Sequence, residues 1–189
     1  MNKDIVLDIE TTGDIRDFKS LRITVVSIYQ YETNTYTSYE EHELGQLWPL
    51  LETCSKIIGY NSEHFDIPIL DKYYAGDLTA IRQLDLLKQI KESVGKRFKL
   101  DDVAKATLGI QKSADGLQAM KWFDEGKIDL IKEYCEQDVK VTKEVYDFGK
   151  ANKQVFITTL TGEKQPIPVN FEPDVEAGAP AAMNMTLPF

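Results

Sequence analysis

The chain has 189 residues, of which 42% are hydrophobic, and it carries a formal net charge of −9. That size and composition can bury one sizeable core, so they favour one globular domain with an appendage over two full domains. The acidic charge argues against a protein that coats nucleic acid through a broad basic surface. The sequence has neither a signal-peptide pattern nor a run of roughly 20 apolar residues, and we therefore expect a soluble, cytoplasmic protein.

The first half of the chain is predicted to alternate between strands and helices. Segments rich in Val, Ile and Tyr are typical of strands, and the first three follow one another with short connections, as in an antiparallel meander. The two cysteines, Cys54 and Cys135, lack zinc or redox spacing and are expected to be reduced thiols. In chain order we expect strands at 4–10, 23–31 and 35–39, a helix at 42–51, a strand at 56–60, a helix at 64–74 and a strand at 84–87.

The second half is predicted to be mainly helical and then to change character after Gly149. Strands followed by interleaved helices indicate an α/β fold, a mixed sheet covered by helices. After Phe171 the sequence becomes acidic, with small residues and several Pro and Gly, a composition typical of a flexible linker. We expect helices at 100–108, 115–124 and 128–148, a hairpin of 154–159 with 165–170, and three units: a domain at 1–150, an appended hairpin at 151–171 and a flexible tail at 172–189.

The segment DIETTG, residues 8–13, places two carboxylates at the end of the first predicted strand. Side chains alternate along a strand, so Asp8 and Glu10 share a face and lie about 7 Å apart along the chain. Two like charges at that separation repel each other. A positive group is therefore expected between them.

Two later segments carry further candidate residues. In GYNSEHFDIPIL, Asp66 follows Phe65 at a predicted helix start, and Asn61 lies in the preceding turn. On its own, Asp66 is typical of a helix cap or of a partner for the helix dipole. In EYCEQDVKVTKEVY, Tyr134 and Asp138 are four residues apart and therefore share one face of a predicted helix.

Together these three ordered motifs, over roughly residues 4–148, resemble the DEDD superfamily of 3′-to-5′ exonucleases, the DnaQ-like proteins with a ribonuclease H-like fold. The motifs are DIETTG, the Asn-x-x-x-Phe-Asp pattern ending at Asp66, and Tyr-x-x-x-Asp ending at Asp138. Tyrosine rather than histidine in the third motif indicates the tyrosine branch. The resemblance implies a ribonuclease H-like mixed sheet with an antiparallel meander and flanking helices.

The resemblance also implies the roles of the site residues. Two Mg²⁺ ions, for which Mn²⁺ can substitute, would supply the missing positive charge and assist displacement at phosphorus. Tyr134 would orient the attacking water by a hydrogen bond, because an unperturbed phenol titrates near pH ~10 and is a poor general base. The metal ligands implied are Asp8, Glu10, Asp66 and Asp138, with Asp8 bridging both ions.

The resemblance also implies contacts with the terminal nucleotide. A Thr-Thr-Gly turn needs no ligand to exist, and Trp122 and Phe123 are more typical of core aromatics than of base-stacking platforms. His64 is expected to be exposed rather than a metal ligand. The residues implied to bind substrate are Thr11, Thr12, Gly13, Asn61 and Phe65.

A basic stretch interrupts this acidic sequence and has two interpretations, which the sequence leaves open. It is either a solvated helix face with its adjoining loop or a surface that follows a phosphate backbone. The acidic residues within it are Glu92, Asp101 and Asp102. The basic residues are Lys88, Lys91, Lys96, Arg97, Lys99, Lys105 and Lys112.

The last six residues resemble the bacterial sliding-clamp-binding hexapeptide, Gln-Leu-x-Leu-x-Leu/Phe. Asn184 stands where that pattern has Gln and Met185 where it has the first Leu, while Leu187 and Phe189 match it. A short peptide with such apolar anchors can enter a pocket on a partner. The alternatives are a tail that folds over the domain's own apolar surface and a tail without fixed structure. A clamp would raise the effective concentration of DNA for an acidic nuclease.

The function implied is a metal-dependent 3′-to-5′ exonuclease that releases nucleoside monophosphates from single-stranded or frayed DNA ends. The first alternative is an exoribonuclease, because contacts that accept or exclude the 2′-hydroxyl cannot be read from sequence. The second is a non-catalytic adaptor that binds nucleic-acid ends or the clamp. The retention of all four carboxylates argues against the adaptor.

Overall fold

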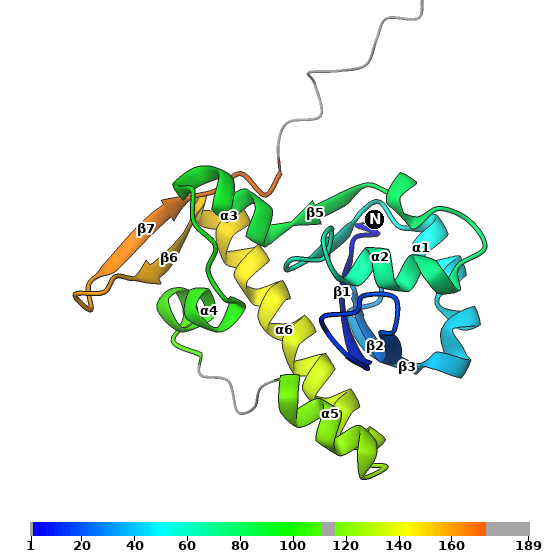
Figure 1. Ribbon diagram of the computed structural model, residues 1–189. Helices are drawn as coiled ribbons and strands as arrows, with labels where there is room; N and C mark the ends of the chain where they lie inside the picture. The colour runs from blue at the N-terminus through cyan, green and yellow to red at the C-terminus, as the bar shows by residue number, and fades with distance from the viewer. Residues whose placement is uncertain (1, 111–115, 173–189) are drawn as a thin grey trace, which may run out of the picture.

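The computed structural model describes residues 2–110 and 116–172, and the peptide 184–189 lies outside this range. Figure 1 shows the arrangement of its helices and strands. In chain order these are β1 Ile5–Thr12, β2 Arg22–Gln30, β3 Thr35–Glu40, the 3₁₀ helix η1 Glu41–Gln46, α1 Trp48–Thr53, β4 Ile57–Gly59, α2 Asp66–Leu70, the 3₁₀ helices η2 Asp71–Tyr73 and η3 Leu78–Ala80, β5 Gln83–Asp85, α3 Leu86–Val94, α4 Leu100–Leu108, α5 Gly116–Asp124, α6 Ile128–Asn152, β6 Gln154–Thr158 and β7 Lys164–Pro168.

The main sheet is mixed, as the sequence predicted. Its strand order is β3-β2-β1-β4-β5. Strands β1, β2 and β3 form an antiparallel meander, whereas β4 runs parallel to β1 and β5 runs parallel to β4. The amino ends of β1, β4 and β5 therefore point to one end of the sheet, and their carboxyl ends point to the opposite end.

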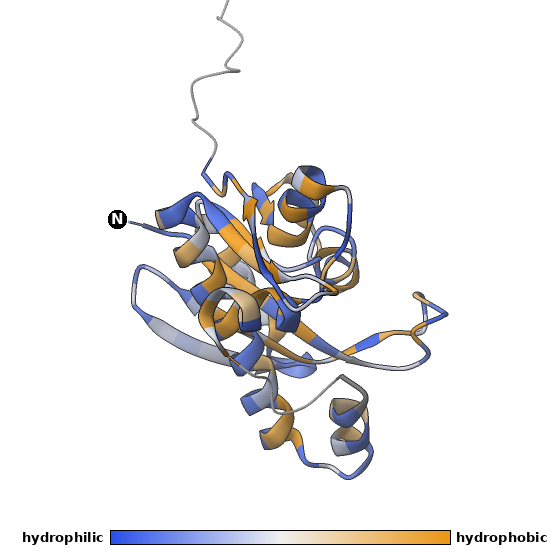
Figure 2. Cartoon of the chain, turned by 90° about the vertical axis from the view of Figure 1, so that its left-hand side faces the viewer, coloured by the Kyte–Doolittle hydropathy of each residue, from blue (hydrophilic) through white to orange (hydrophobic). Residues whose placement is uncertain are grey.

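The alternation of side chains along β1 separates two apolar cores. Ile5, Leu7 and Ile9 pack with residues of α1 and α2 on one face, and Val6 packs with residues of α3, α4 and α6 on the other. The long helix α6 crosses that second face, with α4 and α5 beside it (Figure 1). Apolar residues are concentrated in the middle of the molecule, whereas the loops are mostly hydrophilic (Figure 2).

Two predicted helices differ from the observed ones. The helix expected at 42–51 is divided into η1 and α1, and Pro49 lies in the first turn of α1, where its missing N–H costs no helical hydrogen bond. In the interior of a continuous helix, Pro49 would remove a backbone hydrogen bond, and a new helix that begins at Trp48 avoids this loss. The helix expected at 64–74 begins only at Asp66 and ends in the 3₁₀ turn η2.

The fifth strand ends two residues earlier than predicted. We expected residues 84–87, but β5 ends at Asp85, and Leu86 and Leu87 begin α3, a helix that the sequence analysis did not assign. The Asp85 side chain caps this helix by accepting the N–H groups of Leu87 and Lys88. A capping aspartate before an amphipathic segment is a signal that would have located the helix.

The predicted hairpin is present, but it shares the core of the main domain. Strand β6 pairs with β7 and packs against α4 and α6. Val155, Ile167 and Phe171 are almost fully buried in the same cluster as Val6. Both cysteines are free thiols, as expected. Within the described residues, no helix is long and apolar enough to cross a membrane.

Candidate active site

Strand β1 presents Asp8 and Glu10 toward α6. Asp8 pairs with Ser27 and Glu10 with Val25 on β2, and a β-bulge follows between Glu10 and Thr11. Because side chains alternate, both carboxylates share the face of Val6, which packs against α6. Bulges commonly re-aim side chains beside functional sites, and here the bulge lies directly after the second carboxylate.

Helix α6 supplies the third carboxylate. Asp138 and Tyr134 lie one turn apart on the buried face of α6, and each is 7% exposed. Ligand oxygens of Asp8, Glu10 and Asp138 all lie within 4.8 Å of one another. Three carboxylates this close repel each other unless a cation or protons compensate them, and oxygen donors are what hard divalent cations prefer. The donor set therefore fits a divalent metal ion.

Asp66 approaches the same strand from α2. Its Oδ1 accepts the backbone N–H of Ile9 at 3.2 Å, so it contacts β1 between the two acidic residues of the first motif. Asp66 does not belong to the cluster formed by Asp8, Glu10 and Asp138. Burial above all, with a smaller contribution from the charges of Asp85 and Asp138, raises the pKa of Asp66 to about 7, against the lowering effect of the backbone hydrogen bonds.

Cys135 is a neighbour of the cluster that the sequence analysis treated as an ordinary thiol. It is fully buried, and its Sγ lies 3.4 Å from the carbonyl oxygen of Asp8 and 3.7 Å from Asp8 Oδ2. Burial and the charges of Asp8 and Glu10 raise its pKa well above the usual value. The group is therefore a neutral thiol at pH 7 and donates a weak hydrogen bond to Asp8.

Tyr134 is held by packing as well as by the helix. Its ring lies 6.2 Å from the ring of Trp122 in an edge-to-face arrangement, so α5 supports the face of α6 that carries the site. Trp122 is partly buried and packs against a core cluster, in agreement with the role expected for it. Phe123 is 37% exposed, so the same expectation was wrong for Phe123.

The position of the turn after β1 differs from the prediction. Thr11 and Thr12 were expected in a turn, but they continue the strand and pair with Ile23 and Arg22. The turn begins at Gly13, whose φ is +116°. A Cβ on Gly13 would lie 2.8 Å from the carbonyl oxygen of Ser20, so both backbone conformation and space favour glycine there.

The second motif forms a tight turn that is fixed by Asp85, a residue the sequence analysis missed. Asn61 adopts a left-handed conformation with φ +67°, and its N–H donates to Asp85 Oδ1 at 2.8 Å. The Asn61 side chain accepts a hydrogen bond from Arg97 at 2.7 Å. Phe65 precedes α2, and its ring lies 6.3 Å from Phe18 in an edge-to-face contact. His64 is exposed, as expected.

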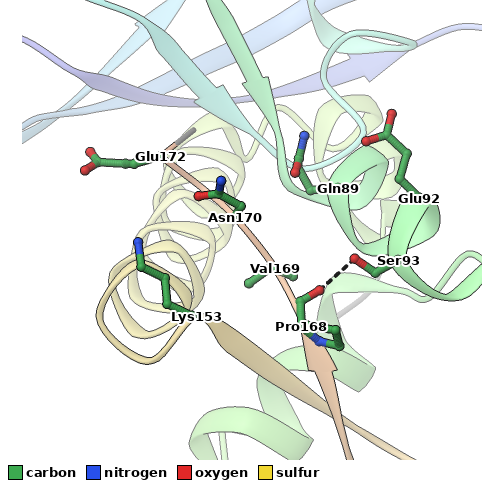
Figure 3. A pocket seen from close by; sticks show the side chains of 8 residues that line it. All are labelled: Gln89, Glu92, Ser93, Lys153, Pro168, Val169, Asn170 and Glu172. Atoms are coloured by element: carbon green, nitrogen blue, oxygen red, sulfur yellow. Dashed lines mark hydrogen bonds between the residues drawn. The ribbon is translucent and has the colours of Figure 1, made fainter. Parts of the chain in front are cut away.

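A separate pocket lies away from the carboxylates, between α3, the end of α6 and the chain after β7 (Figure 3). Its volume is about 780 Å³. Ser93 Oγ donates to the carbonyl oxygen of Pro168 at 2.6 Å across one side of this pocket and joins α3 to the hairpin. None of its lining residues belongs to the candidate site, so we interpret the pocket as a space left where α3 contacts the hairpin.

Two solved structures have a similar fold. The chain is similar to a family B DNA polymerase from the archaeon Pyrobaculum calidifontis, with a TM-score of 0.61 and 15% identity over 77% of this chain and 24% of the polymerase. It is also similar to RNase D of Trypanosoma brucei, with a TM-score of 0.58 and 17% identity over 78% of this chain and 57% of RNase D. The chain thus spans less than two thirds of either protein, and at these identities the likeness concerns the fold alone.

The sequence itself gives the family. No curated protein sequence matches the chain. A model of the RNase_H_2 family, within the RNase H superfamily, matches residues 5–148, which is well over half of the sequence and includes all three motifs. Together with the mixed sheet and the acidic cluster on β1 and α6, this match assigns the chain to the RNase H superfamily.

Proposed function

We propose that this protein is a metal-dependent 3′-to-5′ exonuclease of the DEDD type, tyrosine branch, that releases nucleoside monophosphates from single-stranded or frayed DNA ends. The observation that carries the proposal is the convergence of Asp8, Glu10 and Asp138 within 4.8 Å. Asp66 adds a fourth carboxylate, which is hydrogen-bonded to the strand between the first two. This arrangement suits the binding of two Mg²⁺ ions or of Mn²⁺ in their place.

The divalent ions, when bound, supply charge neutralisation and Lewis acidity at the scissile phosphate. The protein's own groups do the rest. Asp8, Glu10, Asp66 and Asp138 hold the ions, and the Tyr134 hydroxyl orients the attacking water by a hydrogen bond. The turn at Asn61 and Phe65 and the end of β1 at Thr11, Thr12 and Gly13 hold the terminal nucleotide in line with that water.

An RNA substrate is the second candidate. An RNase D and a DNA polymerase share the fold at TM-scores of 0.58 and 0.61, so these likenesses leave both polymers open. We place DNA first and make the RNA activity an outcome of the test.

The tail provides a proposed tether. We propose that Asn184, Met185, Leu187 and Phe189 bind a bacterial sliding clamp, a proposal supported by the sequence pattern of a segment outside the described residues. A tether raises the local concentration of DNA without any new contact in the active site. Deletion of residues 184–189 should abolish binding to an isolated clamp and leave hydrolysis of a short free oligonucleotide unchanged.

The proposal is tested with 5′-labelled single-stranded DNA and RNA of one sequence, incubated with Mg²⁺, Mn²⁺ or a chelator. We expect metal-dependent ladders that shorten from the 3′ end, faster with DNA. The Asp138→Asn variant should lose at least about 100-fold in rate. Asp129→Asn, the same change at an exposed position of α6, is the matched control and should retain the wild-type rate. Absence of shortening with both polymers and both metals would refute the proposal.

A further inference from the structure

We propose that a pocket between the turn 61–65 and α3 binds a backbone phosphate of the substrate strand, upstream of the bond that the carboxylates cleave. The pocket has a volume of about 290 Å³, and its lining includes Lys88, Lys91 and Arg97. This inference rests on the proposed function and adds to it a site for the body of the strand. It also decides between the two interpretations of the basic stretch for these three residues.

The charge available in the pocket is positive although the protein carries −9 overall. Lys88 Nζ pairs with Glu63 Oε2 at 2.6 Å, so that lysine is largely compensated. Within the described residues, no ion pair involves Lys91 or Arg97, and both side chains are exposed. These two cations are therefore available to a ligand, and a phosphodiester is the anion that such a pair attracts most directly on a nuclease.

The buried acid of the pocket does not cancel this charge. Asp85 is 5% exposed, and its carboxylate accepts four backbone N–H groups, those of Asn61, Glu63, Leu87 and Lys88, at 2.8 to 3.3 Å. The Asp85 carboxylate thus interacts mainly with backbone N–H groups of the turn and of the start of α3. The same bonds fix the position of the turn relative to α3, and hence the shape of the pocket.

The pocket lies beside the candidate active site. Strands β1, β4 and β5 run parallel, and Asn61 and Asp85 stand at or just after the carboxyl ends of β4 and β5. Asp8 lies two residues beyond Val6, whose partner Ile58 is the second-last residue of β4. Ligands commonly bind at the carboxyl ends of the strands in α/β sheets. The turn that lines the pocket continues directly into Asp66, which contacts β1 at Ile9. A strand with its 3′ end at the carboxylates can therefore reach the pocket by crossing this turn.

Arg97 is already oriented toward the turn. One of its terminal nitrogens donates to Asn61 Oδ1 at 2.7 Å, which uses only one of the five N–H donors of a guanidinium. The remaining donors suit the planar, two-point recognition of a phosphate. Lys91 lies one turn after Lys88 on α3, on the side that lines the same pocket.

The test compares substrate lengths in the full chain. The double variant Lys91→Gln/Arg97→Gln should raise KM for an eight-nucleotide DNA strand about ten-fold and raise KM for a dinucleotide less than two-fold. A dinucleotide has no upstream phosphate to enter the pocket, and the glutamine amide at position 97 can still donate to Asn61 in place of the guanidinium. The dependence of log affinity on log salt should become shallower by about 0.7, the contribution of one single-strand phosphate contact. A similar rise for both lengths, or no rise for either, would overturn the inference.

The matched control is Lys3→Gln/Lys164→Gln, which removes the same charge at two exposed positions, one just before β1 and one at the start of β7. It should leave the eight-nucleotide KM within two-fold of wild type. If the wild-type protein cleaves nothing, the proposed function fails, and fluorescence anisotropy of the labelled eight-nucleotide strand in chelator then tests the pocket alone. At least five-fold weaker binding by the first double variant supports the pocket, and equal binding overturns it.

Discussion

The backbone N–H of Ile9 donates to Asp66 Oδ1 at 3.2 Å, although the two residues are 57 positions apart in the sequence. This bond joins the start of α2 to β1 just beyond Val6 and Ile58, the last paired residues of the short ladder between β1 and β4. It therefore satisfies a strand N–H that β4 does not reach, and it fixes the fourth carboxylate against the strand that carries two others.

Asp66→Asn separates the chemical role of this residue from its structural role. The amide oxygen can still accept the Ile9 N–H, and a neutral group avoids the cost of a buried charge, so unfolding by urea should change by less than about 1 kcal/mol. Nuclease activity should fall at least about 100-fold. Retention of activity would remove Asp66 from the metal site, whereas loss of folding would show that the charge itself is structural.

Cys135→Ala should weaken the support of Asp8. The change removes a buried sulfur, leaves a small void and deletes the S–H contacts to Asp8, and we expect a loss of about 1 to 2 kcal/mol in the free energy of unfolding. Cys54→Ala is the control, because Cys54 is only partly buried and should cost less. Equal losses in urea denaturation would mean that the contacts with Asp8 contribute nothing.

Gly149→Ala should destabilise the junction between α6 and the chain after the hairpin. A Cβ on Gly149 would clash with Phe171 Cε2, and both residues are buried. Relief of this clash requires Phe171 to move, so a loss of about 1 to 3 kcal/mol is expected despite the helix propensity of alanine. At Gly45 an added Cβ meets nothing within 4 Å, so thermal unfolding of Gly45→Ala should match wild type.

Glu172 should make stability depend on acid pH. Hydrogen bonds from Lys150 and Tyr146 and the nearby charge of Lys56 lower the pKa of Glu172 to about 2. A lowered pKa contributes stability that is fully present above the unfolded pKa of ~4.3 and is lost as the pH falls toward about 2. Glu172→Gln should therefore lower the melting temperature at pH 7 but have a much smaller effect at pH 2.5.

The control for this pH dependence is Glu133→Gln, at an exposed position of α6. Its difference from wild type should be small and should be the same at pH 7 and pH 2.5. If Glu172→Gln showed an equal difference at both pH values, the ion pairs of Glu172 with Lys150 and Lys56 would not be the source of the effect.

The strands and the three motifs could be predicted because each depends on local patterns. Alternation in β1 and the four-residue spacing of Tyr134 and Asp138 define faces without any knowledge of tertiary structure. The mixed fold then follows from the order of strands and helices and from the family resemblance. The sequence also indicated that Asp8 and Glu10 need a positive partner, and the third carboxylate beside them, Asp138, makes that need larger.

The remaining features depend on contacts between distant segments. The role of Asp85 as the acceptor that joins the 61–63 turn to α3 is visible only when β4 and β5 lie side by side. The hairpin was predicted as an appendage because its strands are local, but its burial against α4 and α6 requires the folded core. The contact of Cys135 with Asp8 likewise joins residues 127 positions apart.

The central claim is the removal of nucleotides from the 3′ end by the carboxylate site, and labels at opposite ends of one DNA strand test it most directly. With Mg²⁺, a 3′-terminal label should appear as a mononucleotide from the first turnover, while a 5′ label remains on strands that shorten one nucleotide at a time. Asp138→Asn should release neither label. Early release of the 5′ label, internal cleavage products or full activity of Asp138→Asn would contradict the account.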